Sequence, residues 1–172
     1  MTITFRPLEP ADCDLVAAWR AAPHVTPWFG PSEAHDAEVA AYRAYVDGTS
    51  GKQGHLVLEN GEPVAFVESY VLRDRPQYFA NLKVSDPGAA GLDLFIGPLD
   101  ALGRGLGEPI VRGFLAEVLF VRPEVTACYV APDVRNRRSI EVFERAGFVR
   151  HEDVQVPGDD APAAVLRIER PT

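Results

Sequence analysis

The chain has 172 residues, of which 47% are apolar and 24% charged, and its formal net charge is −8. This length and composition predict one globular domain spanning residues 1–172 and exclude a disordered chain. The acidic balance argues against a nucleic-acid partner, because phosphates are bound by clustered Lys and Arg. No segment reaches the ~18 apolar residues of a membrane span and the N-terminus has no signal-peptide features, so we expect a cytoplasmic protein without a membrane partner.

The first part of the chain predicts an edge strand and two helices. Residues 2–5 alternate polar and apolar side chains as a strand does, and Asp12 stands where it could cap the helix that follows. Proline and glycine interrupt residues 23–31, which predicts a loop that exposes two large aromatic side chains, Trp28 and Phe29. Ser32 is then placed to cap the second helix.

The middle of the chain predicts a hairpin followed by a long loop. The Asn-Gly dipeptide at 60–61 suits a type I′ turn, and it is flanked by two apolar runs, 55–59 and 63–71, that read as strands. Gly48 is expected to end the helix before this hairpin. Residues 73–90 contain several prolines and aspartates without sustained periodicity, so we expect a long loop there.

The second half alternates strands with helices, which predicts an α/β sheet. The expected elements are a strand at 92–96, a helix at about 108–120, a strand at 126–130, a helix at 136–146 and two final strands on either side of 157–160.

Cysteines and histidines do not predict a metal site. Cys13 and Cys128 stand far apart and form no CxxC pair, so we expect two buried free thiols. The four histidines have no metal-binding spacing. We therefore expect no metal, and any cofactor to be organic.

A glycine-rich turn at residues 102–107, LeuGlyArgGlyLeuGly, lies between an expected strand and an expected helix. Glycines allow close backbone approach, and the N–H groups of a first helical turn bind anionic oxygens, so the turn suits a pyrophosphate. It matches neither a Walker loop nor a dinucleotide fingerprint. Arginines outnumber acids between Arg104 and Arg138, six to four, which would attract phosphates in an otherwise acidic protein.

Together, residues 103–107, Asn136 and the run PheGluArgAlaGlyPhe at 143–148 resemble the acetyl-CoA site of the GNAT N-acetyltransferases. The resemblance covers nearly the whole chain. It implies the GNAT α/β fold, a mixed and mostly antiparallel sheet that is splayed in the middle and has helices on both faces, with acetyl-CoA as cosubstrate. The acetyl-CoA residues that it implies are Gly103, Arg104, Gly105, Leu106 and Gly107 for the pyrophosphate, Phe95 and Ile96 for pantetheine and the oxyanion, and Asn136 and Phe143 lining the coenzyme.

Within that superfamily, residues 23–30, 60–71, 86–93 and 102–107 are most similar to aminoglycoside 6′-N-acetyltransferases, and next to siderophore hydroxylysine acyltransferases. The resemblance to the aminoglycoside group implies that Asp93 is the general base. A carboxylate makes chemical sense there, because an alkyl ammonium with a pKa of ~10 must lose a proton before it attacks a thioester.

Two departures from the family pattern bear on mechanism and acceptor. Phe143 replaces a tyrosine that protonates the leaving thiolate in many members, although a thiol pKa of ~8.5 makes the thiolate an adequate leaving group without it. Residues 78–83 lack the acids that the aminoglycoside group has before its AspProGly. The acceptor-site residues proposed from sequence are Trp28, Glu68, Tyr70, Tyr78 and Asp93.

Several functions stay open beside aminoglycoside 6′-N-acetylation. The acceptor could instead be the hydroxylated lysine of a siderophore or a peptide N-terminus. A different class of function is a non-catalytic acyl-CoA-binding sensor. The protein is expected to act as a monomer or homodimer on a small-molecule amine.

Overall fold

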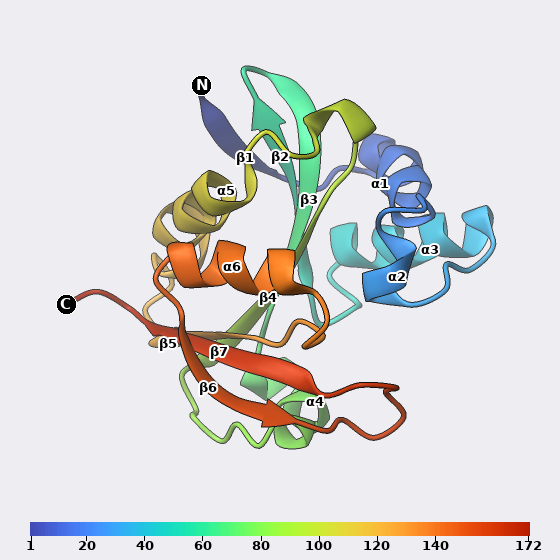
Figure 1. Ribbon diagram of the computed structural model, residues 1–172. Helices are drawn as coiled ribbons and strands as arrows, with labels where there is room; N and C mark the ends of the chain where they lie inside the picture. The colour runs from blue at the N-terminus through green and yellow to red at the C-terminus, as the bar shows by residue number, and fades with distance from the viewer. The chain divides into compact units, whose positions relative to one another are not determined.

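Seven strands pair in the order β1-β2-β3-β4-β5-β7-β6 (Figure 1). Of the pairs described residue by residue, β1–β2, β2–β3, β5–β7 and β6–β7 are antiparallel and β4–β5 is parallel. The predicted mixed, mostly antiparallel α/β sheet is therefore confirmed. The strands are β1 (Ile3–Pro7), β2 (Gln53–Glu59), β3 (Glu62–Val71), β4 (Ala89–Ile96), β5 (Ala127–Val130), β6 (Val149–Val154) and β7 (Ala163–Glu169).

This computed structural model describes all residues, 1–172, and its contacts divide the chain into two compact units. The first comprises Met1–Ser69 and Asp93–Leu106, and the second comprises Tyr70–Leu92 and Gly107–Thr172. The expectation of a single domain stays a prediction. No helix has the length and apolar character needed to cross a membrane.

Helices of the first unit pack against its strands through one apolar cluster. α1 and α3 contact each other, and α3 contacts β2. Val16 of α1 and Tyr42 of α3 meet Leu56, Phe66 and Phe95, which come from three successive strands of the sheet order. The helical segments are η1 (Pro10–Asp12), α1 (Cys13–Arg20), α2 (Thr26–Phe29), α3 (His35–Val46) and η3 (Leu99–Ala101).

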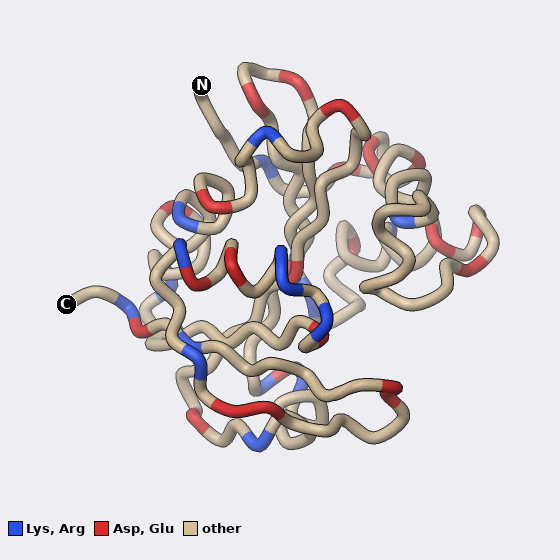
Figure 2. Tube along the Cα trace, viewed as in Figure 1, with Lys and Arg blue, Asp and Glu red and all other residues tan.

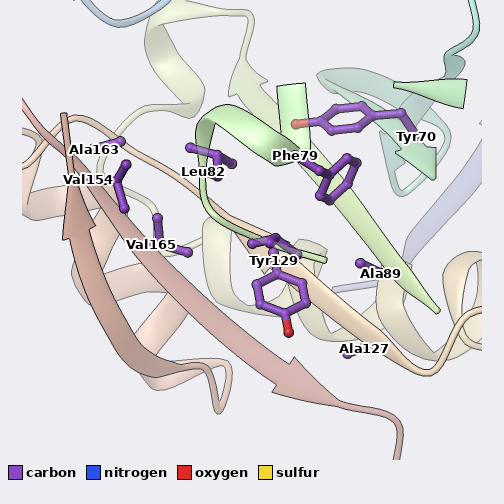
Figure 3. Packing of buried hydrophobic residues seen from close by; sticks show 10 residues of the cluster. Tyr70, Phe79, Leu82, Ala89, Ala127, Tyr129, Val154, Ala163 and Val165 are labelled. Atoms are coloured by element: carbon purple, nitrogen blue, oxygen red, sulfur yellow. The ribbon is translucent and has the colours of Figure 1, made fainter. Parts of the chain in front are cut away.

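A second cluster, shown in Figure 3, lies within the second unit. Phe79 and Leu82 come from the segment around α4, and they pack with Tyr129 of β5 and Val165 of β7. The helical segments of this unit are η2 (Leu72–Asp74), α4 (Pro76–Asn81), α5 (Gly107–Phe114), a π-helical turn η4 (Leu115–Leu119) and α6 (Arg137–Arg145).

The hairpin and the cysteines are as predicted. Asn60 and Gly61 both have positive φ, 50° and 89°, as a type I′ turn requires. Gly48 also has positive φ, 72°, two residues after α3 ends at Val46. Cys13 and Cys128 are buried and form no disulfide.

Both predicted helix caps are wrong. The Asp12 side chain caps no backbone N–H of α1, because it accepts hydrogen bonds from Arg6 and from the Glu9 N–H instead. α3 begins at His35 with Ala34 at its N-cap, which leaves Ser32 outside the helix. At the first site Asp12 instead forms a local capping box with Glu9 of the preceding 3-10 turn, and at the second site the helix starts three residues after Ser32.

Three element boundaries also differ from the prediction. The expected loop at 73–90 contains α4, whose six residues are too few to produce a periodic pattern. β4 begins at Ala89 rather than Leu92, because two alanines and a glycine carry little strand signal. The helix expected at 108–120 is α5 followed by the π-helical turn at Leu115–Leu119.

Candidate active site

Asp93 lies on β4 and is partly buried. It shares a strand face with Phe95, because alternate residues of a strand point the same way. Phe95 packs edge-on against Phe29 at 5.4 Å between ring centroids and contacts Phe66 at 5.5 Å. Because Phe95 packs in the cluster with α1 and α3, Asp93 lies on the face of β4 that the helices of the first unit cover.

Glu68 of β3 lies across from Asp93. The Gly97 N–H donates to the Val64 carbonyl at 3.0 Å, and Phe95 stands beside Phe66, two residues further into both strands. Continuing this antiparallel register by two more residues pairs Asp93 with Glu68. These two acceptor-site residues proposed from sequence are therefore brought together within the first unit.

Both oxygens of the Glu68 carboxylate have protein partners. The Lys52 ammonium lies 2.5 Å from Oε1, and the Tyr45 hydroxyl donates to Oε2 at 2.5 Å. The Lys52 ammonium also lies 5.8 Å from the centroid of the Tyr45 ring. The side chains of Lys52 and Glu68 are only 20% and 12% exposed, so this pair is largely withdrawn from water. Sequence reasoning missed Lys52 and Tyr45, because each depends on a contact distant in the chain.

Tyr45 stays protonated in this setting. Burial raises the pKa of its hydroxyl, and the negative charges of Glu68 and Asp93 raise it further. The hydroxyl is therefore a donor to Glu68 at every pH at which the protein would work.

The segment that carries Trp28 is attached to the rest of the first unit at two points. Trp28 is 43% exposed, as predicted, but it lies on the short helix α2 and not in a loop. Phe29 is only partly exposed, because it packs against the apolar cluster of the first unit. Arg20 donates to the carbonyls of Phe29 and Gly30, at 2.5 and 3.0 Å. His24 Nε2 lies 2.9 Å from the Ile96 carbonyl at the end of β4. Sequence reasoning missed the roles of both Arg20 and His24.

Tyr70 and Tyr78 meet within the second unit, in a T-shaped contact of 5.3 Å between ring centroids. Phe79 completes this aromatic group, drawn partly in Figure 3. Tyr70 is only 4% exposed, and a Cβ on Gly91 would overlap its ring. Tyr70 thus belongs to the apolar core of its unit, while Tyr78 is partly exposed.

The glycine-rich turn has the conformation that its sequence demands. Gly103 and Gly105 both have positive φ, 75° and 77°, and both are exposed. A Cβ at Gly105 would meet nothing within 4 Å, so there is open space beside it. Leu106 is buried, and α5 starts directly afterwards at Gly107, where a Cβ would lie 3.0 Å from Val142 of α6.

Arg104 points its guanidinium at a protein carboxylate. Its Nη2 donates to Glu59 Oε1 at 2.8 Å, and Glu59 is 8% exposed at the end of β2. This ion pair connects the glycine-rich turn to the first hairpin within the same unit. Three of the other arginines in the basic stretch, Arg112, Arg122 and Arg135, are paired with Glu108, Glu124 and Asp133.

Phe95 and Ile96, which the sequence predicted to contact acetyl-CoA, each have some groups already engaged within the protein. The Phe95 side chain is buried in the apolar cluster of the first unit, so only its backbone could contact a cosubstrate. The Ile96 carbonyl is already bonded to His24.

Asn136 and Phe143 lie at the start and in the body of α6. The Asn136 Oδ1 accepts from the Ser139 N–H at 3.1 Å and so caps the helix. The Phe143 ring is buried against Phe148, at 5.3 Å between centroids. Figure 2 shows a basic stretch where α6 begins, and Arg137 and Arg138 are exposed there.

No group of three or more His, Cys, Asp or Glu residues is arranged to hold a metal ion.

Comparison with known proteins adds an independent finding. Residues 9–156 match the family model described as an acetyltransferase (GNAT) domain. An aminoglycoside N(6′)-acetyltransferase type 1 from Klebsiella pneumoniae is 30% identical over 168 residues, which are 96% of this chain and 82% of that protein. A kanamycin resistance protein from Rhizobium radiobacter is 42% identical over 82 residues, covering 48% of this chain and 73% of that protein.

The solved structure of AAC(6′)-Ib in complex with parmomycin and acetyl-CoA superimposes with a TM-score of 0.88 at 30% identity, covering 99% of this chain and 94% of the other. The match to the family model and the similarity to the Klebsiella pneumoniae enzyme both extend over most of the chain. The chain belongs to the GNAT acetyltransferase family.

Proposed function

We propose that the protein transfers an acetyl group from acetyl-CoA to a primary amine of an aminoglycoside, at the 6′ position. The observation that carries this acceptor class is the 30% identity, over 96% of this chain, to an enzyme named for that reaction. The similar solved structure of AAC(6′)-Ib in complex with parmomycin and acetyl-CoA supports the same pair of substrates.

The glycine-rich turn fits the pyrophosphate of acetyl-CoA. Gly103 and Gly105 are exposed, and the open space at Gly105 leaves room for phosphate oxygens next to the backbone. The last backbone hydrogen bond before the turn runs from the Leu102 N–H to the Leu99 carbonyl, so the N–H groups that follow are available to an anion. Arg104 supports this site indirectly, since its guanidinium anchors the turn to Glu59.

Asp93 is the proposed base. Its carboxylate pairs with the incoming ammonium and accepts a proton, directly or through a water, and the neutral amine then attacks the thioester carbonyl. The backbone N–H of Ile96 is proposed to stabilise the negative charge that develops on the carbonyl oxygen, because it faces away from β3, whereas the register of β3 and β4 turns the Phe95 N–H toward β3. Phe143 has no proton to give, so the thiolate leaves unassisted by that residue and is protonated by water or by the product.

Asn136 and Phe143 are proposed to line the coenzyme. Because Asn136 Oδ1 caps α6, its amide NH₂ is the part that remains for a ligand. Trp28, Glu68, Tyr70 and Tyr78 are proposed around the acceptor, with Trp28 as the most exposed surface among them.

The test is an activity assay with acetyl-CoA and a panel of acceptors. Release of the coenzyme A thiol measures turnover, and the mass of the product identifies the acetylated acceptor. The panel contains kanamycin, a hydroxylated lysine and a peptide with a free N-terminus. Acetylated kanamycin is the expected product. Acylation of the hydroxylated lysine or the peptide alone would overturn the acceptor class, and coenzyme binding without turnover of any amine would favour the sensor.

A further inference from the structure

Lys52 holds the carboxylate that lies across from the proposed base. Two carboxylates on facing positions of neighbouring strands repel each other, and a third charge is needed to offset them. Lys52 supplies it, with its ammonium 2.5 Å from Glu68 Oε1. The Lys52, Glu68 and Asp93 side chains therefore carry one net negative charge instead of two.

We propose that Lys52 is a specificity-determining residue whose ammonium occupies the place beside Glu68 that a second ammonium of the acceptor would take. This inference rests on the proposed function. Among aminoglycosides, Lys52 would favour those whose second ammonium is not spaced to reach Glu68 when the reacting amine lies next to Asp93.

The contacts of Glu68 make this exclusion effective. Its Oε2 already accepts from the Tyr45 hydroxyl and its Oε1 is bonded to Lys52, so a substrate ammonium would have to displace a protein group. The Lys52 ammonium also lies over the Tyr45 ring, which adds a cation–π attraction. A partly buried ion pair with these additional contacts is screened by salt much less than a surface pair.

The expected consequence is a gain in binding when Lys52 loses its charge. An ion pair between a protein and its ligand is strongest where both groups are desolvated, and Glu68 is 9% exposed. Because Lys52 occupies the Glu68 carboxylate, it weakens the binding of acceptors with a second ammonium and leaves the binding of acceptors with one ammonium unchanged. When Lys52 loses its charge, acceptors with several ammonium groups should therefore bind more tightly, and acceptors with one ammonium group should bind as before.

The experiment compares Lys52→Gln with wild type on kanamycin and on 6-amino-6-deoxyglucose, a sugar with a single amine. The measured quantity is the ratio of kcat/KM for kanamycin to that for the single-amine sugar. We expect Lys52→Gln to raise this ratio about tenfold. Lys52→Arg, which keeps the charge, should preserve the wild-type ratio.

Matched controls distinguish loss of the Lys52–Glu68 ion pair from a general effect of removing any lysine charge. The chain has only one other lysine, Lys83, whose exposed ammonium lies 3.4 Å from Glu152 in the other unit, and Lys83→Gln should leave the ratio unchanged. The double variant Lys52→Gln with Glu68→Gln should lose the gain, because the carboxylate that would attract the second ammonium is gone. An unchanged ratio in Lys52→Gln, or a gain that persists in the double variant, would overturn the proposal.

A calorimetric titration with kanamycin compares the affinities of wild type and Lys52→Gln without requiring turnover. If wild type binds kanamycin but acetylates neither sugar, the proposed function fails, while the change in affinity on Lys52→Gln still decides the role of Lys52. Thermal melting of each variant verifies that it is folded. If Lys52→Gln fails to fold, Lys52→Met, which keeps the apolar stem of lysine without its charge, takes its place with the same expected and contradicting results.

Discussion

Arg104 of the glycine-rich turn donates a hydrogen bond of 2.8 Å to Glu59 at the end of β2, 45 residues earlier in the chain. The sequence suggested that this arginine holds phosphate, but its guanidinium already has a largely buried carboxylate as partner. Arg104 therefore anchors the turn.

Removing Arg104 should destabilise the protein. Arg104→Ala leaves the Glu59 carboxylate with its charge unpaired and mostly out of water, so we expect the free energy of unfolding to fall by about 1–3 kcal/mol. Urea unfolding measures this change. Arg138→Ala, at an exposed position, is the control and should have little effect. If Arg104→Ala unfolds at the same urea midpoint as wild type, the ion pair contributes nothing to stability.

Coenzyme A should raise the melting temperature, and Gly105→Val should abolish that rise. A ligand that binds only the folded state stabilises it by about 2.7 kcal/mol at a concentration of 100 Kd. Valine at Gly105 meets no protein atom but would fill the space next to the turn, and it also strains a backbone with φ of 77°.

Gly158→Val is a matched control for that strain, because Gly158 has φ of 92° and equally open surroundings in the loop between β6 and β7. It should lower the melting temperature without altering the shift caused by coenzyme A. Unchanged affinity for coenzyme A in Gly105→Val would remove the turn from the binding site.

Asp93→Asn should retain coenzyme A binding and lose turnover. The substitution keeps the shape and removes the base, so kcat/KM is expected to fall by about 10²–10⁴-fold at neutral pH. The loss should shrink at alkaline pH, where more of the acceptor is already a free amine. A pH profile of kcat/KM measures both effects, and full activity of the variant at neutral pH would make Asp93 a structural residue.

Asp12 should make stability depend on acid pH. Burial acts to raise the pKa of this carboxyl, but hydrogen bonds from Arg6 and from the Glu9 N–H outweigh burial and lower its pKa below the ordinary 3.8. A lowered pKa in the folded state adds stability above the unfolded pKa, and this stability is lost as the pH falls through the folded value.

We therefore expect Asp12→Asn to lower the free energy of unfolding by about 1–2 kcal/mol at pH 7, with the difference from wild type narrowing below about pH 4. Urea unfolding over a series of pH values measures it. A difference that stays constant down to acid pH would mean that the Asp12 charge is not the cause.

Local signals determined several elements from sequence. The turn at Asn60 and Gly61 follows from residue types that tolerate positive φ, and the glycine-rich turn follows for the same reason. Local signals failed where the element is short. α4 has six residues, too few for an isolated helix to be stable in water, and its Phe79 packs against Tyr70 of β3.

The sequence by itself determined the residue types suited to acetyl transfer, the glycine-rich turn before a helix and an acid on the strand that precedes it. Only the tertiary structure decided which charges meet. Lys52 with Glu68 and Arg104 with Glu59 are pairs of residues 16 and 45 positions apart, joined by strand register and chain packing. Ion pairs at such separations carry no periodic signal, because any of several oppositely charged side chains could serve until the fold places one within reach.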